Sequence, residues 1–353
     1  MSFSSASSRR LSLIVLAGTL LSGGCSLLGK KTPAPQEGQP VASAASPAAI
    51  AGGDLRVTDT KALSRQKDLS EILVPLEIIR GGPQGNALTG IKYAQFIRPV
   101  AVAARGNDVF VVDAGQDILF KYNRIMGSLD VVMNLRGVLT GEASDIYVAH
   151  DLSFYIADPL GAQVVQFDRR GRLLQTFKSG LNRPVAVSVD DASGRVFVAD
   201  GVYDYILVFS STGQLIGSMG ARGSDSGQFL NITAMTQGRD GFYIAARIGQ
   251  RLQVLGEDGR YRYSLPQEGV IFPAAIAVDP DNRIFVGDFS DDTIKVYEEG
   301  RLVASVGQHG GGLGQFMRIT DLWFDEGLLF VADSMNGRIQ VMRVIPAAQR
   351  QPP

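Results

Sequence analysis

The sequence contains very little cysteine, histidine or tryptophan. Among 353 residues there is one Cys, Cys25, one Trp, and two His, His150 and His309. A single Cys allows no disulfide within the chain and no zinc site built from thiolates. It also leaves no Cys and His pair for thiol catalysis. Chemistry that depends on these residue types is therefore excluded or sharply limited.

The sequence also lacks an excess of positive or negative charge. The sequence has 34 Lys and Arg against 35 Asp and Glu, for a formal net charge of −1. A nucleic-acid-binding domain normally carries a basic face and a basic balance overall. We therefore expect no nucleic acid among the partners.

No apolar stretch reaches the roughly 20 residues that a membrane-spanning helix needs. The stretch from Leu11 to Leu21 follows a basic pair and precedes small residues and Cys25, an order typical of a secretory signal. It resembles a bacterial lipoprotein signal, although Ser22 stands where such signals more often carry an aliphatic residue. We expect residues 1–24 to be a signal peptide and Cys25 to be lipidated. The alternative is a buried free Cys.

A tether and a tail flank the globular region. Residues 25–71 begin with a stretch rich in Pro, Ala, Ser and Gly, which is linker composition, and a flexible chain of about 30 residues reaches about 30 Å. Ser26 is not the Asp that resembles an inner-membrane retention signal. We therefore expect a lipid-anchored protein of the bacterial cell envelope, at the outer membrane and facing the periplasm. Residues 346–353 are predicted to be a disordered tail.

What the sequence does have is a repeat. The stretch "VADSMNGRIQVM" from Val331 resembles "VVDAGQDILFKY" from Val111, and the pattern occurs six times. A period near 44 residues with short apolar runs is typical of a β-propeller, in which each repeat forms one four-stranded blade. The anchor positions of the six copies are Asp113, Asp158, Asp200, Ala246, Asp288 and Asp333.

The strand count predicts how the ring closes. The sixth copy ends without a fourth strand, whereas residues 74–80, "VPLEIIR", form an unassigned strand-like run near the start. We expect this run to be the outer strand of the last blade, which leaves no open sheet edge. The sequence thus predicts an all-β, six-bladed propeller of four-stranded blades over residues 72–345, closed by an N-terminal outer strand.

These motifs resemble the NHL-repeat family of six-bladed propellers. The resemblance depends on the "VAD" strand end, on "NGRIQV" at residues 336–341 and on "GQF" ahead of the next blade. The Arg of the family pattern is present only at Arg251 and Arg338. The resemblance supports the fold and says little of function, because propellers carry many unrelated activities.

Two kinds of candidate site follow from the fold. The recurring Asp precedes a turn, and Asp side chains fix such turns by bonding nearby backbone, so we assign it a structural role. The loops entering the innermost strands are expected to meet at one mouth of the channel. At that slot lie Arg98, Arg183 and Arg318, with Asn231 and Phe272 in two other blades, and Arg247 close by. Converging guanidinium groups can bind carboxylates or phosphates, although each Arg could instead only pair or stack locally.

An enzymatic alternative places calcium in the channel. The resemblance to lactonase-like six-bladed propellers implies oxygen ligands near the starts of inner strands, for which the candidates are Asp145, Asn231 and Asp321. His150 and His309 are expected at opposite faces, so they cannot share a metal.

We therefore predict a monomeric, lipid-anchored binding module or assembly scaffold, with no catalytic residues and no cofactor. It would recognise a protein or an anionic glycan through the channel mouth, with Arg98, Arg183, Asn231, Arg247 and Arg318 as the contact residues. The alternative is a calcium-dependent, lactonase-type hydrolase. A purely structural propeller is the third possibility.

Overall fold

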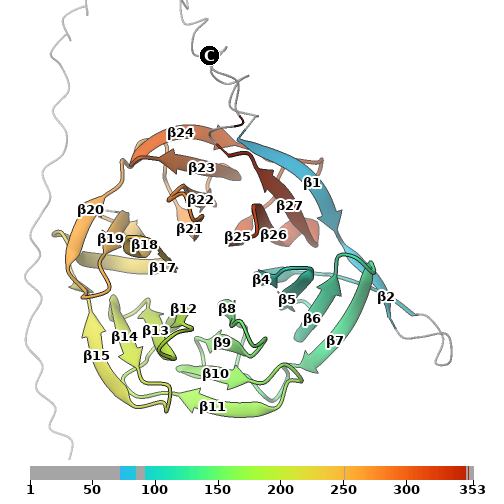
Figure 1. Ribbon diagram of the computed structural model, residues 1–353, viewed down its shortest axis with the longest axis horizontal. Helices are drawn as coiled ribbons and strands as arrows, with labels where there is room; N and C mark the ends of the chain where they lie inside the picture. The colour runs from blue at the N-terminus through green and yellow to red at the C-terminus, as the bar shows by residue number, and fades with distance from the viewer. Residues whose placement is uncertain (1–71, 85–91, 250, 347–348, 350–353) are drawn as a thin grey trace, which may run out of the picture. The chain divides into compact units, whose positions relative to one another are not determined.

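Each repeat forms one antiparallel sheet, and six such sheets are arranged around a common axis (Figure 1). The computed structural model describes residues 72–84, 92–249, 251–346 and 349. These residues belong to one unit, residues 57–353. The prediction of an all-β, six-bladed propeller is confirmed. Cys25 and the predicted signal and tether lie outside the described residues.

The first three blades are continuous in sequence, and each runs from an inner to an outer strand. Their strands are β4 (Pro99–Arg105), β5 (Asp108–Asp113), β6 (Ile118–Asn123) and β7 (Ser128–Asn134) in blade one; β8 (Asp145–Val148), β9 (Phe154–Asp158), β10 (Gln163–Phe167) and β11 (Leu173–Phe177) in blade two; and β12 (Pro184–Asp190), β13 (Arg195–Asp200), β14 (Tyr205–Phe209) and β15 (Leu215–Met219) in blade three.

The next two blades follow the same plan, and blade four carries a short additional strand, β16 (Ala221–Arg222), parallel to the start of its inner strand. The strands are β17 (Gln228–Gly238), β18 (Gly241–Ile248), β19 (Leu252–Leu255) and β20 (Tyr261–Ser264) in blade four, and β21 (Pro273–Val278), β22 (Ile284–Asp288), β23 (Thr293–Glu298) and β24 (Arg301–Val306) in blade five.

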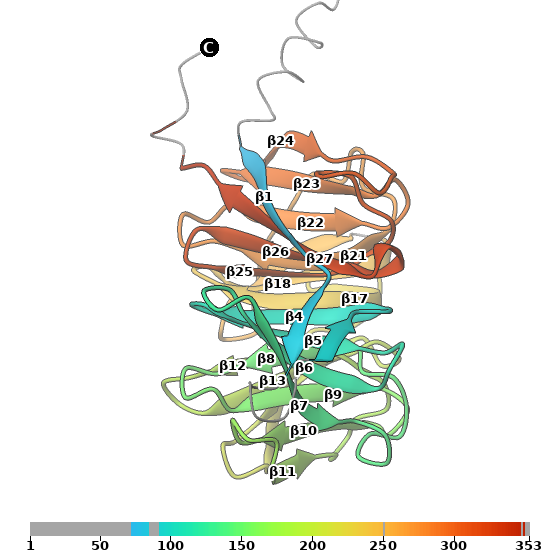
Figure 2. The ribbon, with the colours of Figure 1, turned by 90° about the vertical axis from the view of Figure 1, so that its right-hand side faces the viewer.

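Blade six joins the two ends of the propeller sequence. It contains β25 (Ile319–Asp325), β26 (Leu328–Asp333), a short 3₁₀ turn η2 (Ser334–Asn336) and β27 (Arg338–Val344). Its outer strand is β1 (Leu73–Ile79), which pairs antiparallel with β27 from Leu73↔Val344 to Ile79↔Ile339. Figure 2 shows β1 lying along β27 at the side of the ring. The predicted closure is confirmed, with strand bounds shifted by one residue.

The burial pattern explains why these segments form strands. All five residues of β9 are buried, because a second strand is covered by neighbouring blades on both faces. The outer strand β15 is exposed at four of its five residues. A hairpin of β2 (Gly81–Gln84) and β3 (Lys92–Gln95) continues from β1 and lies against β7.

Glycine permits the turn that carries the "GQF" motif. Gly307 has φ +95°, and a Cβ there would lie 2.6 Å from the ring of Phe316. Gly220 has φ +72°, and its Cβ would lie 2.8 Å from the ring of Phe229. Both Phe side chains are buried, so each Gly lets the chain pass closely over a core ring in a conformation that other residues rarely adopt.

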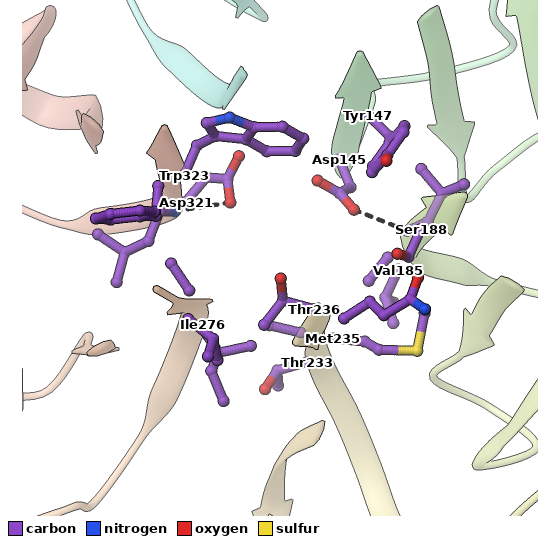
Figure 3. A pocket seen from close by; sticks show the side chains of 18 of the residues that line it. Asp145, Tyr147, Val185, Ser188, Thr233, Met235, Thr236, Ile276, Asp321 and Trp323 are labelled. Carbon is purple, nitrogen blue, oxygen red and sulfur yellow. Dashed lines mark hydrogen bonds between the residues drawn. The ribbon is translucent and has the colours of Figure 1, made fainter. Parts of the chain in front are cut away.

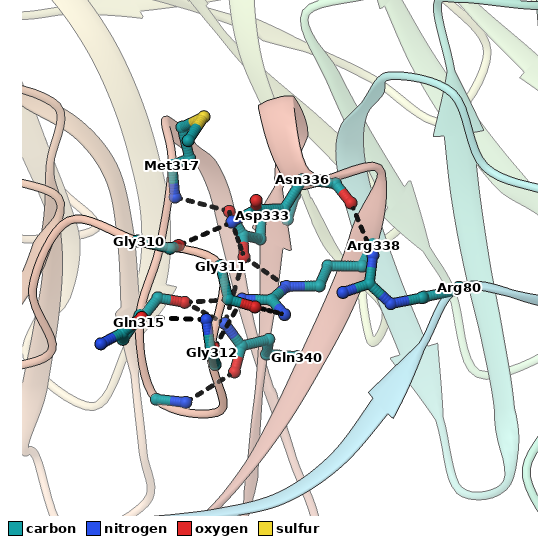
Figure 4. Close-up of polar contacts among 12 residues, drawn as sticks. Arg80, Gly310, Gly311, Gly312, Gln315, Met317, Asp333, Asn336, Arg338 and Gln340 are labelled. Atoms are coloured by element: carbon teal, nitrogen blue, oxygen red, sulfur yellow. Dashed lines mark hydrogen bonds and ion pairs between the residues drawn. The ribbon is translucent and has the colours of Figure 1, made fainter.

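The buried side chain of Arg338 connects blade six to the loop that precedes it (Figure 4). Its side chain is fully buried and its Nε lies 2.6 Å from Asp333 Oδ2. Its Nη atoms donate to the carbonyls of Gly311, Gly312 and Gln315 at 2.7–2.8 Å. Every donor direction of a buried guanidinium should be satisfied in this way, because an unpaired buried charge is costly. The "NGRIQV" motif therefore joins blade six to the glycine-rich loop that precedes it.

Among the described residues, no helix has the length and apolar character needed to cross a membrane.

Candidate functional site

All inner strands start, and all second strands finish, at the same face of the propeller. This follows from the register: Pro99 pairs with Asp113, Pro184 with Asp200. We call this surface the mouth face. One residue per blade occupies the register position of Arg98, and we call these six the mouth ring. Arg98, Glu142, Arg183, Phe272 and Arg318 precede the inner strands of their blades, and Asn231 lies near the start of β17.

The recurring Asp residues hold the mouth ring in place. Asp113 is fully buried and accepts hydrogen bonds from the backbone N–H groups of Ile97 and Arg98. Asp200 does the same for Asn182 and Arg183. The structural role assigned to these carboxylates agrees with this geometry. They position the backbone so that the mouth-ring side chains point out of the turn.

Arg98 is paired with a residue that the sequence interpretation missed. Its Nη2 lies 2.5 Å from Glu142 Oε1, and its Nη1 lies 3.0 Å from Oε2. The hydrogen bond from Arg98, with a smaller contribution from the charge of Arg318, lowers the pKa of Glu142. Glu142 occupies the blade-two position of the ring, where no Pro follows to mark the slot. The pair shows that this position suits a carboxylate.

Arg183 and Asn231 lie together. Arg183 Nη2 donates to Asn231 Oδ1 at 3.1 Å and to the carbonyl of Gly201 at 2.6 Å. Asn231 has a φ of +63°, a conformation that Asn tolerates better than most residues. The side chain of Arg183 remains exposed. This predicted pair is thus brought together, while its charge still faces solvent.

The other two predicted arginines stack on aromatic rings. The guanidinium of Arg247 lies 3.9 Å from the ring centre of Phe272, and that of Arg318 lies 5.2 Å from the ring centre of Phe289. Stacking of this kind is favourable at exposed sites by about 0.5–1 kcal/mol. Both arginines are exposed. The three ring arginines share no common partner among the described residues.

Apolar side chains surround the mouth ring. They occupy the ends of the second strands or the turns that follow them, or stand just before a ring residue, and each is exposed. The set is Ile97, Leu160, Val202, Tyr203, Ile248, Ile271, Phe289 and Met335. Single exposed apolar residues are ordinary, but several on one face indicate an interaction surface.

A cavity of about 410 Å³ lies between the inner strands (Figure 3). Asp145 from β8 and Asp321 from β25 project into it, as does Thr236 from β17. Tyr147 and Trp323 form part of the wall, with ring centres 5.5 Å apart in an edge-on arrangement. A cavity of this volume lies within the range of sites for small molecules.

The two channel aspartates connect neighbouring blades. Asp145 Oδ2 accepts the N–H of Val187 in blade three at 2.7 Å, and Asp321 Oδ2 accepts that of Val102 in blade one at 2.8 Å. The second oxygen of each carboxylate, Oδ1, accepts the backbone N–H of the next residue in the chain, which is Ile146 for Asp145 and Leu322 for Asp321. The effect of desolvation on the pKa of each carboxylate is nonetheless larger than that of these hydrogen bonds. It raises the pKa of Asp145 to about 7 and, together with the charge of Asp145, raises that of Asp321 well above its usual value.

Arg105 closes the far end of the cavity. It stacks over Tyr147 and Trp323 at 5.7 and 5.4 Å from their ring centres. Its guanidinium lies 3.7 Å from Asp191 and 4.0 Å from Asp325. The positive charge of Arg105 is therefore already matched by two carboxylates at that end.

The proposed calcium ligands separate into two places. Asp145 and Asp321 line the cavity, whereas Asn231 is at the mouth with Arg183. In the described part of the chain, no group of three or more His, Cys, Asp or Glu is placed to hold a metal. Calcium takes six to eight oxygen ligands, so the calcium alternative depends on Asp145 and Asp321 alone and stays a prediction.

The two histidines lie apart. His150 Nε2 is 3.5 Å from Asp191, beside the far end of the cavity. His309 Nδ1 is 2.6 Å from Asp292, whose other oxygen accepts the N–H of Arg318 in the mouth ring. This agrees with the expectation that they cannot share a metal.

Comparison with known proteins confirms the fold and no more. No protein-family model matches the chain, so the NHL resemblance stays an interpretation of the motifs. No curated protein matches in sequence. A solved structure of a protein of unknown function from Bacteroides thetaiotaomicron has 16% identity and a TM-score of 0.55, over 74% of this chain and 72% of that one. Virginiamycin B lyase from Staphylococcus aureus has 10% identity and a TM-score of 0.52, over 70% of this chain and 96% of the lyase.

Proposed function

We propose that the protein is a binding module that captures an acidic, partly apolar protein surface on its mouth face. The observation that carries this proposal is the gathering of exposed arginines and eight exposed apolar side chains on one face. Recognition residues are commonly found on loops held by a rigid scaffold, and the hairpin aspartates accept hydrogen bonds from the backbone of these loops.

The chemistry of the mouth ring favours carboxylates. Arg98 already binds Glu142 through two nitrogens, which is the geometry that Arg uses for carboxylate recognition. Arg247 and Arg318 lie over the rings of Phe272 and Phe289, so they lose less conformational freedom when a partner binds. Arginine and aromatic residues are also the types most often found at the energetic centre of protein interfaces.

The placement of the protein is part of the same proposal. Lipid on Cys25 and a tether of residues 25–71 would hold the propeller near a bacterial membrane, facing the periplasm at the outer membrane. This rests on the sequence alone. Replacement of Cys25 by Ala should then release the protein from the membrane fraction, and retention would contradict the anchor.

Matched triple variants test the binding face. R98A/R183A/R318A removes three charges from the mouth ring, whereas R172A/R239A/R260A removes three exposed charges from turns at the opposite face. Binding to immobilised polyglutamate, as a carboxylate-rich polypeptide, and to heparin, as an anionic glycan, is measured for both. We expect tighter binding to polyglutamate, at least tenfold weaker binding of the mouth variant, and unchanged binding of the control.

Two outcomes would overturn this proposal. Equal losses in both variants would show that binding follows net charge and not the mouth ring. Preference for heparin, lost in the mouth variant, would replace the protein partner with an anionic glycan.

The second candidate is a calcium-dependent hydrolase, favoured by the position of Asp145 and Asp321 in the cavity. A ligand that binds only the folded state raises its melting temperature. Calcium should therefore raise the melting temperature of the wild type but not that of D321A. No rise in the wild type would remove this candidate.

A further inference from the structure

The cavity between the inner strands is separate from the mouth ring. The residues that surround it extend along the inner strands from just inside the mouth, at Ser144 and Asp145, to the far end at Arg105, and the mouth-ring residues are not among them. Its polar groups converge from different blades: Asp145 from blade two, Thr236 from blade four and Asp321 from blade six. Convergence of a few polar groups in a concave site with aromatic walls is typical of a small-molecule site.

Blades two, four and six each join the next blade through a hydroxyl at the same position of the inner strand. In blade six this is Thr320, whose Oγ1 donates to the carbonyl of Pro99 at 3.5 Å, and the next residue is Asp321. Ser144 Oγ donates to the carbonyl of Pro184, and Thr233 Oγ1 donates to that of Pro273. The residue after each is Asp145 in blade two but Ala234 in blade four. The threefold pattern of alternate blades would therefore place three carboxylates in the cavity, and the chain supplies two. Ala234 lines the space that a third side chain would fill.

The two carboxylates have no cationic partner among the described residues. The causes that act on the pKa of Asp145 are burial and two backbone N–H groups, and those on Asp321 add only the charge of Asp145. Arg105 is the basic residue of the cavity wall, and it is held at the far end by Asp191 and Asp325. The other titratable groups nearby are Tyr147, in the wall, and His150, beside Asp191.

The cavity therefore offers negative charge, a hydroxyl and aromatic surface without a cation to complete it. We propose that it binds a small organic cation, a primary ammonium or diamine, between Asp145 and Asp321. Ammonium donates to oxygens and is favourable beside aromatic rings, so Thr236 and the wall of Tyr147 and Trp323 would contribute. The volume of about 410 Å³ accommodates a ligand of several heavy atoms.

Binding should be coupled to protons. A cation favours the ionised carboxylates, so a proton held by the aspartates must leave. Since burial raises the pKa of Asp145 to about 7 and raises that of Asp321 well above its usual value, affinity should rise by about tenfold or more per pH unit as the pH approaches 7. A neutral ligand of the same length would show no such dependence.

The test uses 1,4-diaminobutane as the probe, with 1,4-butanediol as its uncharged counterpart. Heat of binding and melting temperature are recorded for the propeller between pH 5.5 and 8.5. We expect the diamine to bind with the stated pH dependence and the diol not to bind. D145N/D321N should lose at least tenfold in affinity. A234L, which narrows the cavity from blade four and leaves both carboxylates in the sequence, should lose a similar amount.

The mouth variant R98A/R183A/R318A serves as the folded control and should bind the diamine as the wild type does. This control separates a failure of the proposed diamine site from a failure of the mouth-face proposal. Absence of diamine binding at pH 8, or equal binding of the diol, would overturn the inference. Diamine binding that A234L leaves unchanged would place the site elsewhere and overturn it too. If D145N/D321N does not fold, diamine binding by A234L and the pH dependence of diamine binding by the wild type still test the proposal.

Discussion

Aspartates occupy two kinds of position in the propeller, and the two kinds differ in what surrounds the carboxylate. Asp288, at a hairpin, accepts the N–H groups of Ile271, Phe272 and Ser290, and the hydroxyl of Ser290. Although burial alone would raise its pKa, these hydrogen bonds lower it. Asp145 accepts two N–H groups, and burial raises its pKa to about 7.

The difference lies in how fully each carboxylate is satisfied by the protein. A carboxylate that accepts several donors is stabilised as an anion, whereas one that is desolvated with few donors is not. The hairpin positions recur in five of six blades and hold backbone. The channel positions break the repeat and face a cavity. Repetition in this chain thus marks residues that support the fold, and its interruptions mark residues available for binding.

The largest effect on stability is expected when the buried ion pair of Arg338 and Asp333 in blade six is broken. Arg338→Leu leaves Asp333 as an unpaired buried charge and should lower the free energy of unfolding by about 3–5 kcal/mol. Among the described residues, the side chain of Arg251, the matching residue in blade four, donates to the carbonyls of Arg247 and Val270, at 3.2 and 3.4 Å. Arg251→Leu should cost about 1 kcal/mol. Urea unfolding of both variants checks this, and equal losses would contradict the role given to the Asp333 pair.

The next effect distinguishes the two kinds of aspartate directly. Asp288→Ala leaves at least three backbone or hydroxyl donors without an acceptor, and we expect a loss of about 2–3 kcal/mol. Asp321→Asn keeps one acceptor for Val102 and removes a charge that burial disfavours. It should cost less than Asp288→Ala at pH 8. The same unfolding assay at that pH measures both, and the reverse order would show that the channel carboxylates chiefly support the fold.

The pH dependence of stability provides a smaller effect per pH unit, at most about 1.4 kcal/mol. The pKa of Asp145 is about 7 in the folded protein against 3.8 ordinarily. Between these values the folded state holds a proton that the unfolded state has lost. The contribution of Asp145 is therefore complete below about pH 4, is lost as the pH rises to about 7, and then stays constant. In D145N this part of the slope should be absent, as measured by urea unfolding from pH 4 to 8. An unchanged slope would contradict the raised pKa.

The smallest effect on stability is expected at the mouth ring. Arg98, Arg183 and Arg318 pair or stack at the surface, where such contacts contribute about 0–1 kcal/mol each. The triple Ala variant should therefore keep a melting temperature within a few degrees of the wild type. A large drop would assign these arginines to the fold, against their proposed role in binding.

Much of this architecture could be predicted from the sequence, because a propeller repeats its strands and its turn residues. The anchors from Asp113 to Asp333 fixed the number of blades, and the spare strand before Gly81 fixed the closure. Glu142 was missed in blade two, which has Ala143 where blades one, three and five have Pro. The stacking of Arg247 on Phe272 depends on how two blades meet, which no single repeat encodes.

The cavity shows the same limit. Asp145 and Asp321 were recognised as channel residues, but Asn231 was grouped with them although it lies at the mouth. Register within a blade follows from sequence, whereas the depth of a residue along the channel depends on where each inner strand starts. The apolar turn residues such as Leu160 and Met335 did carry a signal, since turns normally favour small or polar residues.

The most direct test of the contrast is a carbon-13 NMR titration of the aspartate carboxyl groups, assigned with D145N and D288N. The account predicts that the Asp145 signal titrates with a midpoint near pH 7 and that 1,4-diaminobutane moves this midpoint to lower pH. The Asp288 signal should titrate below the ordinary Asp value of 3.8 and should not respond to the diamine. An Asp145 midpoint below pH 5, close to that of Asp288, would contradict the account, because the two kinds of carboxylate would then be equally well satisfied by the protein.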